Sequence, residues 1–364
     1  MKQPHKEEPF VKSFRLRRLR WVLVPALAVG LVALGTGAAT ASTSSKKLKT
    51  ATLNGSGSTL QAAFDQEAIA EFTAKESNVT INYAGGGSGK GRQDLADEVV
   101  DFAGSDSPFS ADDLAKVQGG DLLYFPTVVS PVTVSFNIEG VKKLKLSGST
   151  ISKIFQRTVT TWDAPAIADE NPGAKLPSTD ITVVHRSDSS GTTANFVTFL
   201  TKADPSGWKL GVGSTINWPA DTTGGEGNSG VAGVISSTDG AIGYVDYSDA
   251  KAAGLTLAAV KNQLGKYVKA TVKGASEAAA TVAINDDLTY DPIYATGPSS
   301  YPITAPTWVI VYQSQTDAAK TAALKRFLKF ILTKGQKLAA SVDYAPLSAD
   351  LTQRALAQLD QIQA

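Results

Sequence analysis

Short apolar stretches and helical patterns alternate along the chain from about residue 51 onward. Apolar residues recur at helical spacing over residues 60–72, with Ser58 and Gln61 matching a capping box, and residues 79–83 have the alternation of a strand. A second strand, at residues 99–103, follows a glycine-rich turn and a short helix. Strands that alternate with helices predict βαβ units with parallel sheets. The pattern therefore predicts an α/β fold.

The second half of the chain repeats this alternation. We expect a helix near residues 151–156 and strands at residues 181–185 and 241–245. The last part of the chain, at residues 318–332 and 349–363, has the apolar spacing of amphipathic helices.

Two apolar segments are expected to carry the chain between two sheets. The run at residues 124–136 leads out of the first sheet, and a return crossing is expected near residues 301–312. We therefore predict two lobes, each with a central, mostly parallel sheet flanked by helices, joined by hinge crossings. Lobe 1 is expected to comprise residues 51–130 and 303–364, and lobe 2 residues 131–302.

The first 41 residues have the pattern of a targeting segment. Five basic residues between Lys12 and Arg20 precede a nearly apolar stretch at residues 21–34, and Ala39-Thr40-Ala41 fits a cleavage site. We predict a signal peptide at residues 1–41, followed by a polar linker at residues 42–50. The apolar stretch extended to Ala41 has about 20 residues, enough to cross a membrane, so an uncleaved N-terminal anchor is the alternative.

Composition narrows the chemistry available to an exported protein. The chain has no cysteine, which excludes a lipid-modified N-terminal Cys, thiolate catalysis and zinc–thiolate sites. Without residues 1–41 it keeps 28 basic and 32 acidic residues, a net charge near −4, and a single histidine, His185. A weakly acidic protein lacks the basic surface that nucleic acids require, so we expect no nucleic-acid partner.

Four turns share one composition, with Gly, Ser or Thr where a predicted strand passes toward a helix. Such helix starts present free backbone N–H groups and hydroxyls, which bind oxyanions. Ligands of open α/β sheets lie at the carboxyl ends of the strands, where these turns converge. The alternative for any single turn is an ordinary helix cap. The turns are Gly57-Ser58-Thr59, Gly87-Ser88-Gly89, Ser105-Asp106-Ser107 and Ser190-Gly191-Thr192.

Two charged residues stand beside these turns. Arg186 ends the predicted strand at residues 181–185, where its guanidinium group is able to bind ligand oxygens in pairs. Asp106 is unexpected, because a carboxylate repels an anion. A carboxylate only accepts hydrogen bonds, so it favours an anion that carries a proton over a fully deprotonated sulfate. The alternatives are that Asp106 caps a helix or pairs with Arg186.

The ordered set of motifs resembles the extracytoplasmic phosphate-binding proteins of ATP-driven phosphate importers. The resemblance extends over about residues 51–364 and is carried by residues 55–59, 83–89, 100–106 and 186–192. It implies the type II periplasmic-binding-protein fold, in which two lobes close on the ligand.

The resemblance also implies which residues bind phosphate. Asp106 accepts the proton of hydrogen phosphate, Arg186 binds phosphate oxygens, and the remaining residues supply hydroxyls and backbone N–H groups. Asp188 is our own addition, as a residue that orients Arg186. Leu60 departs from the aromatic residue of some relatives, which a backbone contact tolerates. The phosphate-binding set is Ser58, Thr59, Leu60, Ser88, Asp106, Arg186, Ser190, Gly191 and Thr192.

The implied function is high-affinity binding of inorganic phosphate outside the cytoplasmic membrane, periplasmic or extracellular, and delivery to the permease of an ABC phosphate importer. We expect a monomer without catalytic activity, cofactor or metal. Two alternatives stay open. One is a secreted or surface oxyanion-scavenging protein of the same fold. The other is a phosphohydrolase, which needs an activated nucleophile or a metal that the sequence does not suggest.

Two further motifs are not expected to carry chemistry. His185 alternates with Arg186 along the strand, so it points away from a site that Arg186 faces. Residues 225–230 match G-x-G-x-x-G, but they follow a polar loop near Trp218 with no strand pattern, which argues against a dinucleotide site.

Overall fold

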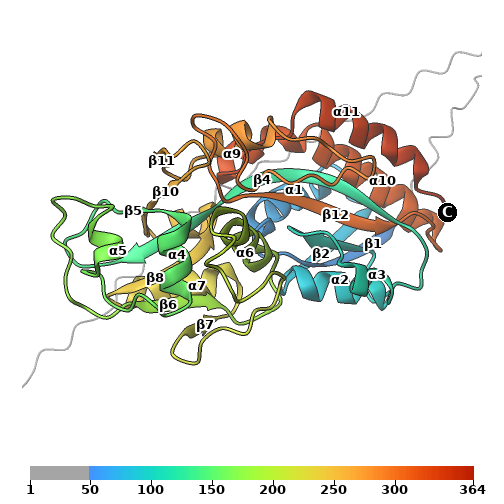
Figure 1. Cartoon of the computed structure of the whole chain (residues 1–364). Helices are drawn as coiled ribbons and strands as arrows, with labels where there is room; N and C mark the ends of the chain where they lie inside the picture. The colour runs from blue at the N-terminus through green and yellow to red at the C-terminus, as the bar shows by residue number, and fades with distance from the viewer. Residues whose placement is uncertain (1–48) are drawn as a thin grey trace, which may run out of the picture. The chain divides into compact units, whose positions relative to one another are not determined.

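A nine-stranded sheet forms the centre of the structure (Figure 1). The structure, a computed structural model, describes residues 49–364, so the predicted signal peptide and residues 42–48 of the predicted linker lie outside the described residues. The mixed α/β architecture confirms the predicted fold class. In sheet order the strands are β2 (Val79–Gly85), β1 (Ala51–Gly57), β3 (Phe102–Ser105), β12 (Thr304–Tyr312), β4 (Leu122–Asn137), β8 (Ala241–Asp246), β6 (Thr182–Arg186) and β7 (Thr223–Gly225), with β9 (Thr256–Leu257) paired to β4.

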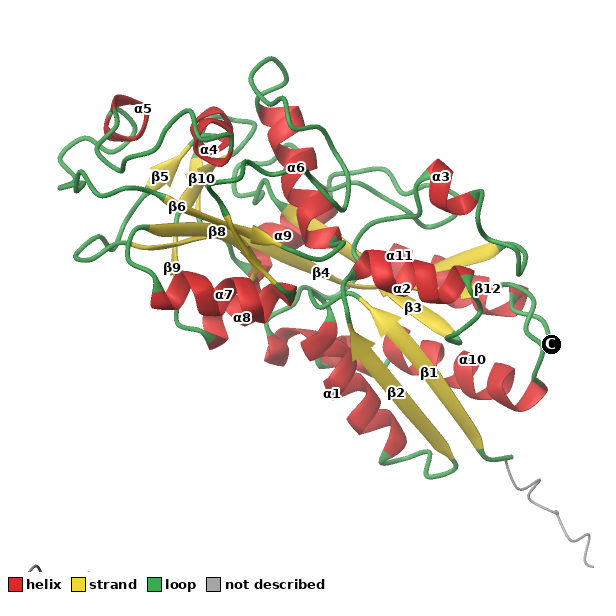
Figure 2. Cartoon of the chain, turned by 90° about the horizontal axis from the view of Figure 1, so that it is seen from below, coloured by secondary structure: helices red, strands yellow, loops and turns green. Residues whose placement is uncertain are grey.

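Helices lie on both faces of this sheet (Figure 2). The first half of the sheet, with β1, β2 and β3, is covered by α1 (Ala62–Thr73), α2 (Ser88–Ala96) and α10 (Ala318–Leu332), and α11 (Ala349–Gln358) packs on α10 and β4. The second half, with β6, β7 and β8, is covered by α6 (Gly191–Ala203), α7 (Gly227–Ser237) and α8 (Tyr247–Ala252), and α4 (Gly148–Phe155) packs on α6. Shorter elements are α3 (Ala111–Leu114), α5 (Pro165–Ala168), α9 (Val272–Ala279), three 3-10 turns at residues 335–337, 339–342 and 359–361, and a small sheet of β5 (Lys145–Leu146), β10 (Ala259–Lys261) and β11 (Tyr267–Val268).

Within each half the strands are parallel and end at the same edge. Gly57 at the end of β1 lies opposite Gly85 of β2 and Gly104 of β3. In the second half, Arg186 at the end of β6 lies opposite Gly225 of β7. The turns that follow these strands are therefore gathered by the register of the sheet, as expected for ligand sites of α/β proteins.

Two long strands join the halves, as the apolar runs predict. The 16-residue β4 pairs with β12 as far as Pro131 and with β8 from Val132 onward, in both cases antiparallel. Figure 1 shows the N-terminal strands beside the C-terminal helices on one side of this crossing and the middle of the chain on the other. The exact division into lobes at residues 130/131 and 302/303 stays a prediction.

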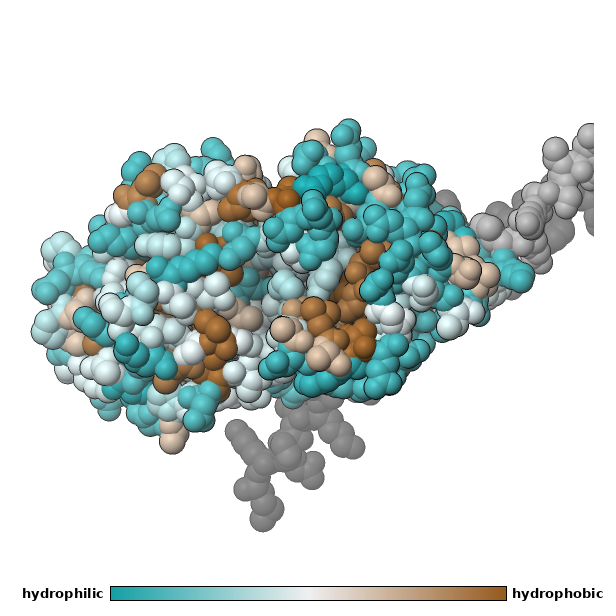
Figure 3. All heavy atoms as spheres, turned by 45° about the vertical axis from the view of Figure 1, so that its right-hand side comes forward, coloured by the Kyte–Doolittle hydropathy of each residue, from teal (hydrophilic) through white to brown (hydrophobic). Residues whose placement is uncertain are grey.

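Buried apolar side chains form one large cluster in each half, with a smaller third one under α7. Leu53, Phe102 and Trp308 belong to the first, and Val183, Phe196 and Tyr244 to the second. The face seen in Figure 3 is mainly hydrophilic with small hydrophobic patches. Each half thus has its own core, which supplies a rigid base for the turns above it.

Several local predictions are wrong in detail. The predicted capping box fails, because α1 begins at Ala62 after Gln61 and Ser58 bonds within its own turn. The strand predicted at residues 99–103 begins only at Phe102, and the last helix ends at Gln358 before a 3-10 turn. Residues 225–230 do follow a strand, the short β7. That strand, Thr-Gly-Gly, has no apolar residue by which to recognise it.

Candidate oxyanion-binding site

All four predicted turns meet between the two halves of the sheet. Gly89 N donates to Ser189 O (2.9 Å), which joins the turn after β2 to the turn after β6. Asn195 Nδ2 on α6 donates to the carbonyl oxygen of Asp106 (2.6 Å), in the turn after β3. The residues predicted from sequence to form one site therefore lie together, although up to 134 positions separate Ser58 from Thr192.

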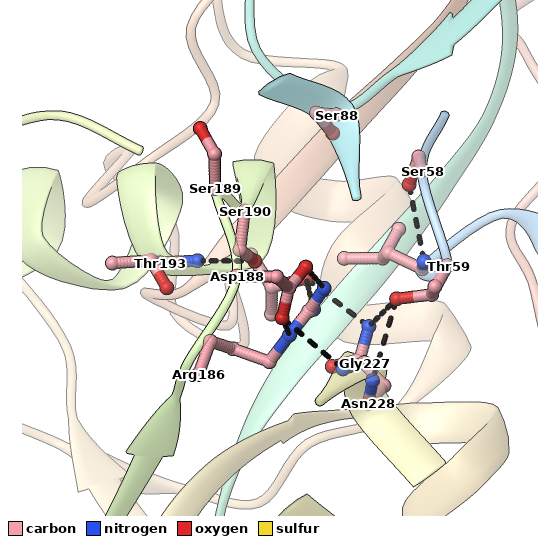
Figure 4. Close-up of polar contacts among 12 residues, drawn as sticks. Ser58, Thr59, Ser88, Arg186, Asp188, Ser189, Ser190, Thr193, Gly227 and Asn228 are labelled. Carbon is pink, nitrogen blue, oxygen red and sulfur yellow. Dashed lines mark hydrogen bonds and ion pairs between the residues drawn. The ribbon is translucent and has the colours of Figure 1, made fainter. Parts of the chain in front are cut away.

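The turn after β1 presents Thr59 to the second half (Figure 4). Ser58 Oγ accepts a hydrogen bond from Leu60 N (3.0 Å), and Tyr344 Oη donates to Leu60 O (2.7 Å). Ser58 and Leu60 are fully buried and hold the shape of the turn. The Leu60 N–H, predicted to bind the ligand, is thus engaged with Ser58, whereas the Thr59 hydroxyl faces α7.

Asp106 is buried at the centre of the site and surrounded by hydroxyls. Ser88 Oγ donates to its Oδ1, and Thr192 Oγ1 donates to its Oδ2 (3.3 Å). An ionised carboxylate has about four acceptor positions, so these two bonds leave room for a proton of a ligand. Asp106 neither caps a helix nor pairs with Arg186, the two alternatives that the sequence left open.

Arg186 is fixed by Asp188, as we expected for that residue. Arg186 Nε donates to Asp188 Oδ1 (2.7 Å), and Nη2 makes a second, short bond to Oδ2. The Asp188 carboxylate also accepts from Gly227 N (3.1 Å). Burial acts to raise the pKa of Asp188, but the bonds and the charge of Arg186 outweigh it and lower that pKa. The paired guanidinium still directs Nη1 to Thr192 Oγ1 (3.3 Å).

Helix α6 starts at the site with Ser190 as its N-cap, the alternative that the sequence left open for such turns. Ser190 Oγ accepts from Thr193 N (3.2 Å). Gly191 permits the close approach of the two halves, because a Cβ there would lie 2.5 Å from both the Asp106 carboxylate and Ser88 Oγ. Thr192 Oγ1 lies at the centre, between the guanidinium of Arg186 and the carboxylate of Asp106.

The charges of the site do not favour an anion by themselves. Arg186 is balanced by Asp188, and the Asp106 carboxylate lies near the buried guanidinium of Arg92, while the helix start and the hydroxyls add only dipoles. Net charge alone therefore gives this site no selectivity for an anion, and selectivity has to come from the number and direction of hydrogen bonds.

Comparison with known proteins identifies the family. A sequence profile described as "PBP superfamily domain" matches residues 36–334. "Phosphate-binding protein PstS" of Methanocaldococcus jannaschii is 34% identical over 360 residues, 92% of each chain. The protein of that name from Xylella fastidiosa is 32% identical over 317 residues, 85% of each chain. The chain belongs to the PstS family of this superfamily.

Solved structures agree at the level of the fold. A high-affinity periplasmic phosphate-binding protein, PfluDING, bound with phosphate, superposes with a TM-score of 0.71 over 85% of this chain and 94% of its own. Its sequence identity is 24%, so this likeness supports the fold alone. The structural likeness and the sequence relatives together support the two-lobed fold of the PstS family for this chain.

One buried residue of this PstS-family site escaped the sequence analysis. Asn228, at the start of α7, donates from Nδ2 to Thr59 Oγ1 (3.1 Å) and to Thr192 Oγ1 (3.2 Å). It lies in the G-x-G-x-x-G run that the sequence argued against as a nucleotide site. The useful signal was a glycine-rich helix start with a single amide side chain, but no strand pattern marked β7 before it.

Arg92 is a second residue that the sequence analysis missed. Its buried guanidinium donates from Nη1 to Ser105 Oγ (3.1 Å) and Ser107 Oγ (2.8 Å), on either side of Asp106. Nη2 reaches Ser214 Oγ (3.4 Å) in a loop of the second half. Arg92 therefore holds the turn that carries Asp106, rather than taking part in the site directly.

His185 lies away from the site, as the strand alternation predicts. Its ring stacks on Trp218, with 5.0 Å between centroids, and its Nδ1 lies 2.8 Å from Arg186 O. Burial lowers the pKa of His185. The imidazole contacts none of the predicted phosphate-binding side chains, which agrees with a structural role.

Two kinds of feature are absent from residues 49–364. No helix in that range is long and apolar enough to span a membrane. No group of three or more His, Asp or Glu side chains in the same range is placed to hold a metal ion.

Proposed function

We propose that this protein binds inorganic phosphate, as hydrogen phosphate or dihydrogen phosphate, and delivers it to the permease of an ABC phosphate importer. The observation that carries the proposal is the convergence at Thr192 of a guanidinium from one side and a carboxylate from the other. Such a pair suits an anion that both carries charge and donates a proton. The relatives named phosphate-binding protein PstS support the same ligand.

The binding roles follow from the chemistry of each group. Arg186, held by Asp188, takes phosphate oxygens, and the N–H groups of Gly191 and Thr192 at the start of α6 add donors. Ser88 and Thr59 supply hydroxyls from the first half. Asp106 accepts the P–OH proton, which a sulfate dianion lacks.

Closure of the two halves on the ligand is part of the proposal. The contacts between Asp106 and Thr192 and between Gly89 and Ser189 join turns of different halves. A ligand that bonds to both halves stabilises their joined arrangement through its differential contacts. The permease then recognises that arrangement, outside the cytoplasmic membrane, with no catalytic step, cofactor or metal.

Calorimetric titration of the ligand-free protein with phosphate and then with sulfate tests the proposal. We expect phosphate to bind with a Kd of about 1 μM or less, and sulfate at the same concentrations to give no heat. Equal binding of both anions would indicate a general oxyanion receptor and contradict the role of Asp106. Absence of binding to both would overturn the proposed function.

A further inference from the structure

Figure 4 shows the amide of Asn228 beside the Thr59 hydroxyl of the first half, and the same amide also contacts the Thr192 hydroxyl of the second half. Its Nδ2 donates to Thr59 Oγ1 (3.1 Å) on the first half and to Thr192 Oγ1 (3.2 Å) on the second. Its backbone N donates to Thr59 Oγ1 as well (3.3 Å). Asn228 is fully buried, so both protons of its amino group are used within the site.

The orientation of the Asn228 amide is fixed by contacts on the side away from the two threonines. Asp246 N donates to Asn228 Oδ1 (3.1 Å), and the Asp246 side chain caps α8. The preceding residue, Gly227, has a φ of +66° and donates its N–H to Asp188. With the oxygen of the amide held by Asp246, the amino group has only the two hydroxyls to face.

These contacts determine where the hydroxyl protons point. A hydroxyl has two acceptor positions and one proton. Thr59 Oγ1 receives two N–H groups of Asn228, and none of the residues at 49–364 accepts its own proton. Thr192 Oγ1 receives Asn228 Nδ2 and Arg186 Nη1, and its proton points toward Asp106. Thr59 Oγ1 is therefore held as a donor toward the space between the halves, whereas the proton of Thr192 Oγ1 is directed to the Asp106 carboxylate.

We propose that Asn228 is a positioning residue, which sets Thr59 as a hydrogen-bond donor to phosphate, directs the Thr192 proton to Asp106 and links the two halves while the ligand is held. This inference rests on the proposed phosphate-binding function. Because Thr59 and Asn228 belong to different halves, their bonds exist only when the halves are together. Loss of the amide is then expected to raise the rate of phosphate release more than it lowers the rate of binding.

A double-mutant cycle tests the proposal in the full-length protein, with phosphate titrated by calorimetry. N228A is expected to lower phosphate affinity about tenfold, in the range of one to two lost hydrogen bonds. In a T59V background the same substitution is expected to cost clearly less, because one of the hydroxyls it orients is already gone. N228D, which keeps an oxygen for Asp246 N but replaces the donor by an acceptor, is expected to bind more weakly than N228A.

Asn195 provides the matched control. Its buried amide also joins the halves, but it donates only to the backbone oxygens of Asp106 (2.6 Å) and Gly191 (2.9 Å). N195A should therefore weaken binding by the same factor with or without the Thr59 hydroxyl.

The outcomes separate the inference from the function on which it rests. An unmodified protein that fails to bind phosphate would overturn the proposed function. An unmodified protein that binds tightly, together with an N228A effect that is absent or equal in both backgrounds, would overturn only the positioning role. Thermal unfolding without phosphate shows whether N228A folds. If it does not, N228D replaces it, and an N228D variant that binds phosphate as tightly as the parent would also overturn the positioning role.

Discussion

The two halves of the site differ in the kind of group they offer. Among the predicted site residues, the first half supplies hydroxyls from Thr59 and Ser88 and one carboxylate, Asp106, but no cation. The second half supplies a cation, Arg186, already paired with Asp188, and the start of α6. The first half is thus suited to detect a proton on the ligand, and the second to bind its charge.

Two carboxylates, Asp65 in the first half and Asp188 in the second, also differ in how their charge is compensated. In the first half, Asp65 on α1 is fully buried with one hydrogen bond, from Gln61 Nε2 (2.8 Å), and its Oδ1 has no partner. In the second half, Asp188 has a guanidinium and a backbone N–H. Burial raises the pKa of Asp65 to about 7, whereas Arg186 lowers that of Asp188. Asp65 is therefore an uncompensated buried acid, whereas Asp188 is a compensated one.

Removal of the cation from the second half is expected to have the largest effect. R186A leaves the anion without its charge partner and Asp188 uncompensated, so phosphate affinity should fall by about 2–5 kcal/mol, the range for a buried, hydrogen-bonded charge pair. Calorimetry with phosphate measures the loss. R157A, which removes a guanidinium paired with Asp221 outside the site, is the control and should bind like the parent. Unchanged affinity of R186A would contradict the site as described.

A change in the acceptor of the first half is expected to alter selectivity rather than abolish binding. D106N gives up one full acceptor and adds a donor, so sulfate no longer meets an unpaired carboxylate. We expect phosphate affinity to fall modestly and sulfate affinity to rise about tenfold or more. Titration with both anions measures the ratio. Sulfate excluded as strongly as by the parent would show that Asp106 does not detect the proton.

Much of the fold followed from the apolar pattern because its key strands are long and buried. All residues from Leu123 to Phe136 in β4 are buried, so the crossing segment was visible as one apolar run. By contrast, β7 is three residues long and lies at the edge of the sheet, with no apolar side chain to mark it. Because β7 was not predicted, the start of α7 could not be recognised as a turn between a strand and a helix.

Site residues were predicted where their turn had a recognisable composition. They were missed where their role depends on contact with a residue far away in the sequence. Asp106, Arg186 and the start of α6 lie in motifs of hydroxyls, glycines and charge. Asn228 is one amide in a glycine-rich run, and its partner Thr59 is 169 positions away. No local pattern encodes such a contact, since only the register of the two halves brings the residues together.

Neutralisation of the uncompensated acid tests the contrast between the buried carboxylates. In the folded protein Asp65 has a pKa of about 7, above its ordinary value of 3.8, so its contribution to stability is present at low pH and is lost as pH rises toward 7. The free energy of unfolding of the parent, measured with urea, should fall by about 1–3 kcal/mol between pH 5 and pH 8. D65N should not show this fall. E67Q, at an exposed position of the same helix, is the control. Parallel pH profiles of parent and D65N would contradict the assignment.

Asp188 should show the opposite dependence of stability on pH. Its pKa is lowered in the folded protein, so its contribution to stability is present above the ordinary carboxyl pKa and is lost as pH falls through the folded value. Without phosphate, D188N should therefore be less stable than the parent at pH 7, and this difference should shrink below about pH 4. D221N breaks an ion pair at the exposed Arg157–Asp221 contact and should change stability less at every pH. A D188N deficit that persists unchanged into acid would mean that Asp188 acts by its shape and its bond to Gly227, and that the charge of Arg186 in the second half is not compensated by it.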